Sequence, residues 1–294
     1  MKDVRGERDV DQYLADRFEA HRPHLKGVAY RMLGSLSEAD DAVQEAWIKL
    51  SRADADGVEN LGGWLTTVVG RVCLDMLRTR TARQETPMPD PVVSRPGGID
   101  PEQEALVADS VGLALLVVLE SLTPAERLAF VLHDMFAVPF EEIAPVVGRS
   151  TIATRQLASR ARRRVQGAAP VPDPDTRRQR EVVDAFLAAA RDGDFAGLVA
   201  VLAPDVVLRA DAGTQRTEIR GADEVAGNAL LFRRFHDRFS TYPALVNGMA
   251  GVVNATAGEP MSVMSFTITD GRITAIDILA DPERLRRLDL AVLD

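Results

Sequence analysis

Apolar residues recur at helical spacing over residues 38–50. Placed at 100° steps, the segment predicts an amphipathic helix whose apolar face holds Ala39, Val43, Ala46, Trp47 and Leu50. The opposite face holds Glu38, Asp41, Glu45 and Lys49. Ile48 is the exception, because it falls among the polar residues beside Asp41 and Gln44. The polar face is therefore either a solvated surface with one stray apolar residue or a docking surface for a partner.

The segment 62–80 predicts a second helix with two distinct faces. Its apolar face consists of Leu65, Val69, Val72, Cys73 and Met76. A separate stripe consists of Trp64, Val68, Arg71, Asp75 and Arg78. The charged residues of this stripe form either a surface salt-bridge ladder or a strip facing nucleic acid, where Trp64 supplies a stacking surface. The polar loop 52–60 before the helix is a candidate binding edge of the same strip.

Two segments rich in proline and glycine interrupt the helical pattern and divide the chain. Prolines at this density forbid a continuous helix and favour extended backbone. We therefore predict a helical module over 1–86, a linker over 87–105, a second helical module over 106–166, a linker over 167–175 and a third module over 176–294.

The second module carries a helix-turn-helix pattern. A helical segment over 111–119 precedes Thr123, Pro124 and Glu126, which form a capping box for the next helix. The short helical segment 139–147, the turn Gly148–Ser150 and the helical segment 151–165 follow. This order is typical of a helix-turn-helix motif.

The last helix of this motif is strongly basic. Its inward face holds Ala153, Leu157, Ala158, Ala161 and Val165. Between Arg149 and Arg164 there are six arginines and no acidic residue, whereas a solvated face usually mixes both signs. The segment therefore predicts contact with DNA. Base readout is expected from Arg155, Gln156 and Ser159, and phosphate contact from Arg160, Arg162, Arg163 and Arg164.

The third module combines helices and strands. Helices are predicted over 177–191 and 194–202, followed by alternating apolar residues at Val206, Leu208 and Ala210. Two further alternating runs flank Asp270 and Gly271, which is a strong hairpin signal. The order predicts an α+β fold in which a sheet curls around a helix.

Composition and charge narrow the function. A chain of 294 residues with 46% hydrophobic and 27% charged residues is not a disordered or collagen-like protein. Its net charge of −9 opposes binding to the phosphate backbone, which argues against a free-standing, non-specific DNA binder. The acidic excess lies mostly in residues 167–294, whose net charge is −5, against −2 for 1–86 and −2 for 87–166.

Membrane, disulfide and metal chemistry find no support in the sequence. The longest apolar run, 111–119, is too short to span a membrane, and residues 1–10 lack a signal peptide's apolar stretch, so we expect a cytoplasmic protein. Cys73 is the single cysteine, which excludes an internal disulfide and a cysteine zinc cage. His21 and His24 stand at i and i+3, but four histidines without a matching cluster make a metal site unexpected.

The first two modules together resemble the bacterial extracytoplasmic-function (ECF) sigma factors, which select promoters for RNA polymerase. The resemblance covers residues from about 10 to 166. Its carriers are the segments 39–47 and 64–69 with Asp75 and Arg78, and then 141–144, 148–150 and 153–163. Each segment is weakly specific, but the ordered set is strongly specific.

The resemblance implies a role for each surface. The helix with Asp41, Gln44, Glu45 and Ile48 would dock on the β′ clamp helices of core RNA polymerase. The helix with Trp64, Arg71 and Arg78, together with the preceding loop, would melt and capture the −10 element. The second module would contact the β flap and read the −35 element of promoter DNA with Arg149, Ser150, Arg155, Gln156, Ser159, Arg160, Arg162 and Arg163.

The third module resembles the SnoaL-like cone fold that one subgroup of these sigma factors carries. In that subgroup the added domain regulates activity by contacting the sigma domains, and a dedicated anti-sigma protein is not expected. The resemblance places the contact at a linker stretch, here 86–93, and at a loop with Asp211 and Gly213. It implies no cofactor and no enzymatic activity.

Two other functions remain open. One is a stand-alone helix-turn-helix regulator that senses a small ligand in the C-terminal cavity. The other is a cone-fold cyclase or hydrolase, for which Asp211, His236 and Asp277 are the candidate acids and bases.

Overall fold

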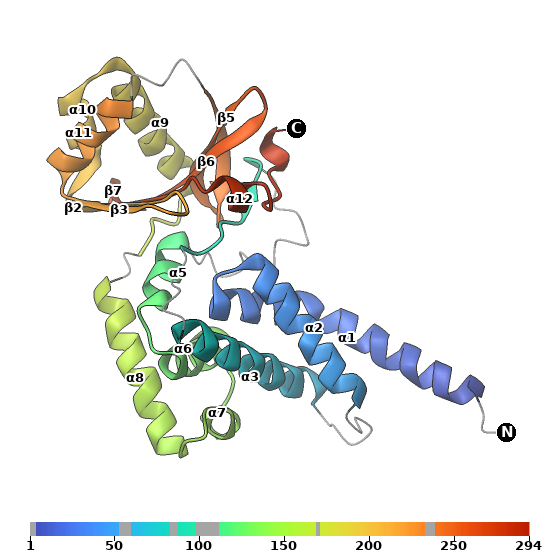
Figure 1. Cartoon of the computed structure of the whole chain (residues 1–294). Coiled ribbons are helices and arrows are strands. Elements are labelled where there is room, and N and C mark those ends of the chain that lie inside the picture. The colour runs from blue at the N-terminus through green and yellow to red at the C-terminus, as the bar shows by residue number, and fades with distance from the viewer. Residues whose placement is uncertain are drawn as a thin grey trace. The chain divides into compact units, whose positions relative to one another are not determined.

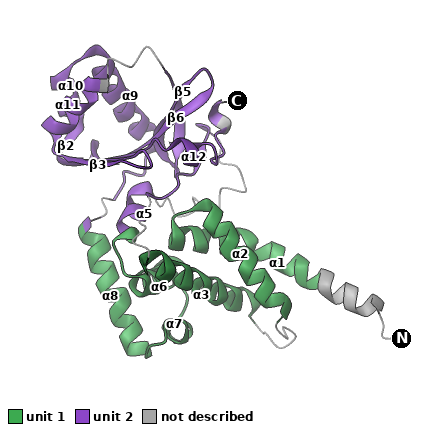
Figure 2. Ribbon diagram, viewed as in Figure 1, with its two compact units in different colours: residues 1–86, 119–167 green, residues 87–118, 168–294 purple. Residues whose placement is uncertain are grey.

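The chain forms two compact units, each assembled from two separate stretches of sequence (Figure 2). The computed structural model describes residues 4–52, 60–82, 88–97, 112–168, 171–232 and 239–293. Unit 1 contains residues 1–86 and 119–167, and unit 2 contains residues 87–118 and 168–294. The proline-rich first linker therefore belongs to the same compact unit as the C-terminal module.

Unit 1 is helical throughout its described residues (Figure 1). Its helices are α1 (Val4–Leu33), α2 (Leu36–Arg52), α3 (Leu61–Ala82), α6 (Pro124–Phe130), η2 (Val131–Met135, a π-helix), α7 (Phe140–Val147) and α8 (Thr151–Ala168). The boundary between the units falls within α5 (Leu113–Glu120). The helices predicted over 38–50 and 62–80 are thus confirmed as α2 and α3, each slightly longer than expected.

The predicted start of α6 is confirmed in atomic detail. The Thr123 hydroxyl accepts a hydrogen bond from the Glu126 backbone N–H, and the Glu126 carboxylate accepts one from the Thr123 backbone N–H. This reciprocal pair satisfies two amides that a helix start leaves without partners. The helix-turn-helix is also confirmed, because α7 ends at Gly148 in the left-handed conformation and α8 begins at Thr151.

The first and second modules pack against each other within unit 1. Gly70 of α3 faces α6 and η2, and a methyl group in its place would lie 3.2 Å from Leu128 Cδ1 and 3.0 Å from Leu132 Cδ1. Arg127, which is 3% exposed, donates a hydrogen bond to the Met32 carbonyl at 2.9 Å and pairs with Glu120 at 2.8 Å. The helix-turn-helix is therefore held against α1 and α3.

Unit 2 is built on a curved seven-stranded sheet with the order β1-β4-β5-β6-β7-β2-β3. The strands are β1 (Val93–Ser94), β2 (Leu202–Asp211), β3 (Arg216–Arg220), β4 (Ser240–Val246), β5 (Met249–Thr256), β6 (Glu259–Thr269) and β7 (Arg272–Leu279). All neighbours are antiparallel except β2 and β7. The predicted Asp270–Gly271 hairpin joins β6 to β7, with both turn residues at positive φ.

Helices cover one face of this sheet. They are α9 (Thr176–Asp192), α10 (Phe195–Val201) and α11 (Ala222–Phe232), as Figure 1 shows. Phe186 of α9 meets Phe266 of β6 edge to face, with ring centroids 5.6 Å apart, at the centre of this core. The expected α+β fold with a sheet curled around helices is therefore confirmed.

A smaller core lies on the opposite face of the sheet. Val263 and Leu279 point to this side and pack with Leu285 of α12 (Pro282–Leu285). The C-terminal segment with the 3₁₀ turn η4 (Ala291–Leu293) adds to the same core. None of the helices in the described ranges has the length and hydropathy of a membrane-spanning segment.

Candidate nucleic-acid and protein interfaces

Helix α2 presents one polar strip to solvent. Asp41, Gln44 and Glu45 are exposed and Ile48 is half-buried, while Ala39, Ala42, Val43, Ala46 and Leu50 are buried beneath them. The four residues stand at i, i+3, i+4 and i+7, so they form one continuous surface. Glu45 also pairs with Lys49 at 2.9 Å, whereas Asp41 has no ion pair with any described residue.

Helix α3 presents the second predicted surface. Arg71, Asp75 and Arg78 are exposed, and Trp64 and Val68 are partly exposed along the same stripe. Arg78 pairs with Asp75 at 3.3 Å, but Arg71 pairs with no described carboxylate. A complete salt-bridge ladder is therefore absent from this stripe among the described residues. The loop residues 53–59, also considered as a binding edge, lie outside the described residues.

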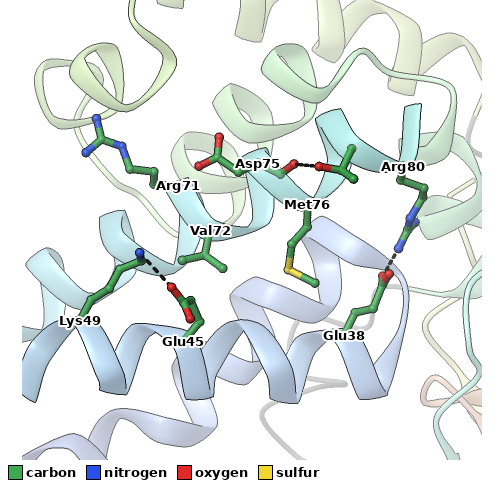
Figure 3. A pocket seen from close by; sticks show the side chains of 9 residues that line it. Glu38, Glu45, Lys49, Arg71, Val72, Asp75, Met76 and Arg80 are labelled. Carbon is green, nitrogen blue, oxygen red and sulfur yellow. Dashed lines mark hydrogen bonds and ion pairs between the residues drawn. The ribbon is translucent and has the colours of Figure 1, made fainter. Parts of the chain in front are cut away.

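A pocket of about 400 Å³ lies between exposed parts of α2 and α3 (Figure 3). Glu38, Glu45 and Lys49 line it from α2, and Arg71, Val72, Asp75, Met76, Thr79 and Arg80 line it from α3. The ion pair between Arg80 and Glu38 closes one end, and the Lys49–Glu45 pair lies at the other (Figure 3). The polar strip of α2 and the arginine stripe of α3 thus border a common charged hollow.

Helix α8 turns its predicted recognition residues outward. Arg155, Gln156, Ser159, Arg160 and Arg163 are exposed, while Thr154, Ala158 and Ala161 are buried against the rest of the motif. Arg149 and Ser150 are exposed in the turn before the helix, and Arg162 is half-buried. The inward face differs slightly from the prediction, because Ala153, Leu157 and Val165 are only partly buried.

Carboxylates from elsewhere in the motif hold most of these arginines. Arg155 pairs with Glu141 at 3.1 Å, Arg162 with Asp134 at 2.7 Å and Arg160 with Glu126 at 3.2 Å. Arg164 lies 3.5 Å from the same Glu126. Burial of Glu126 opposes its ionisation, but hydrogen bonds from Thr123 and Arg160 outweigh this and lower its pKa. Arg149 and Arg163 have no ion pair within the described residues.

Sequence patterning missed these acidic partners. The segment 149–164 contains no carboxylate, so its charge looked uncompensated. The partners lie 14 to 38 positions earlier in the chain and reach α8 only through the packing of the motif. No local spacing rule relates such residues.

Asp211 of unit 2 fixes the first linker to the sheet domain. One of its oxygens accepts hydrogen bonds from the Met88 backbone N–H and from Arg284, each at 3.2 Å. The other accepts the Gly213 backbone N–H at 3.0 Å, which shapes the loop after β2. Arg284 in turn binds Asp90 and the Met88 carbonyl, both at 2.5 Å. Asp211 and Arg284 therefore bind the Met88 backbone, and Arg284 also binds the Asp90 carboxylate.

Asn247 holds the next part of the linker. Its side-chain oxygen accepts a hydrogen bond from the Val92 backbone N–H at 3.1 Å, and its own backbone N–H donates to the Val92 carbonyl at 2.7 Å. Val93 and Ser94 then pair with Val246 and Leu245 as the edge strand β1. Residues 88–94 are thus bound to the C-terminal domain by side-chain and backbone hydrogen bonds, and Val93 enters its smaller core.

Comparison with known proteins identifies the family of this chain. The family model "Sigma-70 region 2" matches residues 17–83, and "Sigma-70, region 4" matches residues 112–165. "ECF RNA polymerase sigma factor SigJ" of Mycobacterium tuberculosis H37Rv is 40% identical over 289 residues, which is 91% of each chain. The chain belongs to the ECF RNA polymerase sigma factors.

Two further similarities extend over nearly the whole sigma factor. "Probable ECF RNA polymerase sigma factor SigI" of M. tuberculosis CDC 1551 is 35% identical over 275 residues, covering 91% of this chain and 93% of that one. The crystal structure of M. tuberculosis SigJ has a TM-score of 0.76 and 39% identity, covering 94% of this chain and 99% of that chain. The stand-alone regulator is therefore not favoured, because the similarity to sigma factors includes the C-terminal domain.

The candidate acids and bases of the alternative enzyme do not gather on the helix-covered face of this domain. Asp277 pairs with Arg209 at 3.1 Å and faces the same side of the sheet as Leu279, away from α9. Asp211 lies on that side as well, where its carboxylate accepts a hydrogen bond from the Met88 backbone N–H of the linker. Burial raises the pKa of Asp277 despite the attraction of Arg209. His236 lies outside the described residues.

The two spaced histidines of region 2 do not form a described metal cluster. His24 Nε2 lies 3.2 Å from the Thr66 hydroxyl, and its ring meets Phe136 edge-on at 5.2 Å. No group of three or more potential ligands is found among the described residues. His24 instead belongs to the packing between α1, α3 and the end of η2.

Proposed function

We propose that this sigma factor docks on the β′ clamp helices through α2, captures the −10 element with α3, contacts the β flap through region 4 and reads the −35 element with α8. One observation supports the whole assignment: α2, α3 and α8 each bury one face and expose the face that carries the residues concerned. Core polymerase provides most of the affinity of the complex for DNA, because the sigma factor is acidic overall.

The docking surface is tested by charge reversal. The variant Asp41→Lys/Glu45→Lys reverses two exposed carboxylates of α2, and Glu259→Lys reverses an exposed carboxylate on β6 as a control. We expect run-off transcription with core polymerase, and recovery of core by the tagged sigma factor, to fall at least tenfold in the first variant only. Equal activity of both variants would contradict docking through α2.

The −35 surface is tested separately. Arg155→Ala removes an exposed arginine of α8, and Arg286→Ala removes an exposed arginine of the C-terminal domain. We expect Arg155→Ala to bind core normally but to lose promoter-dependent initiation. If it initiates from the same promoters at the same rate, α8 does not read the −35 element.

We also propose that the C-terminal domain modulates this activity by holding the linker between regions 2 and 4, so that no dedicated anti-sigma protein is needed. Three hydrogen bonds support this proposal: Asp211 accepts from the Met88 N–H, Asn247 accepts from the Val92 N–H, and Arg284 donates to the Met88 carbonyl. A linker held along β4 has fewer conformations available, which limits where regions 2 and 4 can be placed.

Release of the linker provides the test. Arg284→Ala/Asn247→Ala removes two of its anchors, while Arg286→Ala changes a neighbouring exposed arginine. We expect transcript yield to change at least threefold in the double variant, upward if the domain restrains initiation and downward if it positions the linker. A yield equal to that of Arg286→Ala would rule out regulation through this contact.

A further inference from the structure

One exposed apolar side chain stands at the start of the recognition helix. Ile152 is the second residue of α8 and is 70% exposed. Among the described residues of unit 1 it is the most exposed large apolar side chain. A single exposed isoleucine is common on protein surfaces, so its position and its neighbours decide its meaning.

Ile152 begins the same outward strip as the polar recognition residues. Arg155, Gln156 and Ser159 follow at i+3, i+4 and i+7, and all three are exposed. Thr154 and Ala158, on the other side of the helix, are fully buried. Ile152 therefore shares the surface of α8 that is turned away from the protein, at its N-terminal end. In helix-turn-helix proteins, the N-terminal residues of the recognition helix contact base edges in the major groove.

The charges along α8 also favour its N-terminal half for base contact. Arg160 and Arg164 are paired with Glu126, and Arg162 is paired with Asp134. Carboxylates of the protein itself therefore compensate the positive charge of the C-terminal half of α8. In the N-terminal half only Arg155 is paired, and its partner Glu141 is as exposed as the arginine itself. The surface available to base edges is thus Ile152 with Arg155, Gln156 and Ser159.

We propose that Ile152 contacts the C5-methyl group of a thymine in the −35 element and so contributes to promoter choice. This inference rests on the proposed reading of the −35 element by α8. Thymine carries the one methyl group that a base pair displays in the major groove, and apolar side chains read it by contact. An isoleucine cannot donate or accept a hydrogen bond, so this methyl group is the base feature that it can recognise.

Replacement of thymine by deoxyuridine isolates the contact, because it removes only the methyl group. The −35 sequence is identified first, from run-off templates whose upstream element is randomised. Full-length sigma factor and core polymerase transcribe this pool in repeated rounds, and the templates that are transcribed give the sequence. Each thymine of that element is then replaced singly by deoxyuridine. We expect one replacement to lower initiation by the wild type about fourfold, the effect of losing one buried methyl group.

Three variants complete the design. Ile152→Ala should start lower on the thymine template and show no further loss with deoxyuridine, whereas Ile152→Val should retain most of the methyl effect. Met261→Ala removes an exposed apolar side chain of β6 and should behave as the wild type. Both sites are solvent-exposed, so we expect each variant to fold, and circular dichroism checks this before transcription.

The outcomes separate this inference from the proposed function. If the holoenzyme initiates but no deoxyuridine replacement matters, or if Ile152→Ala loses the same factor on both templates, then Ile152 does not read a thymine. The second pattern would indicate that Ile152 contacts polymerase instead. If no template supports initiation with any variant, the sigma-factor mechanism proposed for α8 fails together with this inference.

Discussion

His24 shows how one side chain couples packing to protonation. Its side chain remains partly exposed, and partial desolvation lowers its pKa, with the positive charges of His21 and Arg31 acting in the same direction. The folded state therefore favours the neutral ring, which lies against Phe136 and beside the Thr66 hydroxyl. In the unfolded chain the ring takes up a proton near pH 6.5. As the pH falls below about 6.5, the unfolded state binds the proton first and unit 1 loses stability.

We predict that His24→Gln removes part of this acid sensitivity. Urea unfolding at about pH 7.5 and about pH 5.5 should show a larger loss of free energy of unfolding for the wild type than for the variant. The chain has two tryptophans, Trp47 and Trp64, so their fluorescence reports on unit 1. An identical pH dependence in both proteins would exclude His24 as the titrating group.

Glu141 forms an exposed ion pair with Arg155, the arginine expected to read a base. It pairs with Arg155, whose guanidinium also lies 5.7 Å from the centroid of the Phe140 ring. That ring stacks on His133 at 3.7 Å. The arginine is therefore held between a carboxylate and an aromatic face before DNA arrives, which reduces the entropy it loses on binding.

We predict that Glu141→Gln leaves stability within about 0.5 kcal/mol, because the pair is exposed. Discrimination at the base pair that Arg155 contacts should fall about fivefold, the lower end of a good base contact. Holoenzyme footprinting on promoters changed at single −35 positions measures this. Glu142→Gln, at the adjacent exposed carboxylate, should leave discrimination unchanged. Equal behaviour of the two variants would argue against orientation by Glu141.

At the scale of elements, the capping box of α6 links helix formation to the recognition helix. The Glu126 carboxylate accepts a hydrogen bond from the Thr123 hydroxyl at 2.8 Å and another from Arg160 of α8. The carboxylate that caps one helix therefore anchors another. Such a box follows from residue types three positions apart, whereas its connection to Arg160 requires the folded motif.

We predict that Thr123→Ala lowers the free energy of unfolding of unit 1 by about 1 kcal/mol. Thr81→Ala is the control, because Thr81 is an exposed residue in the last turn of α3, where its hydroxyl bonds the Leu77 carbonyl. Alanine favours a helix at such a position, so no loss is expected there. Urea titration followed by tryptophan fluorescence compares the two. A loss in the control as large as that in Thr123→Ala would show that the cap is not the cause.

At the scale of the molecule, regions 2 and 4 pack against each other in unit 1, and this packing bears on how both could contact one promoter. The −10 and −35 elements are about 25 base pairs apart, or about 85 Å along the duplex. In unit 1, α3 packs directly on α6 and α7, and packed helices lie about 8–10 Å apart. If α3 and α8 read these elements as proposed, the compact arrangement of unit 1 cannot bind both at once, and regions 2 and 4 separate when the holoenzyme engages a promoter.

We predict that Gly70→Met opens unit 1. Its side chain meets Leu128 and Leu132 at a contact where even a methyl group is tight, and overpacking of this kind costs about 1–3 kcal/mol. The variant should give a larger radius of gyration in X-ray scattering and a higher transcript yield at limiting sigma concentration. An unchanged radius together with an unchanged yield would show that the contact at Gly70 does not limit opening.

Local sequence patterns predicted much of the fold because they depend on near neighbours. The exposed strip of α2, the stripe of α3 and the capping box at Thr123 each follow from successive residues one, three or four positions apart. The Asp270–Gly271 turn likewise requires only two residues that tolerate positive φ. For the same reason the outward residues of α8 were predictable, but not the carboxylates that pair with its arginines.

The sequence by itself determined the helices, the hairpin, the order of the modules and the surfaces that face outward, because periodicity and capping are short-range effects. Only the tertiary structure decided which charges are compensated, that region 4 packs on region 2, and that residues 88–94 join the sheet domain. Arg284 and Met88 lie 196 positions apart, and contacts at such separation arise from the packing of whole elements. No spacing along the chain encodes them.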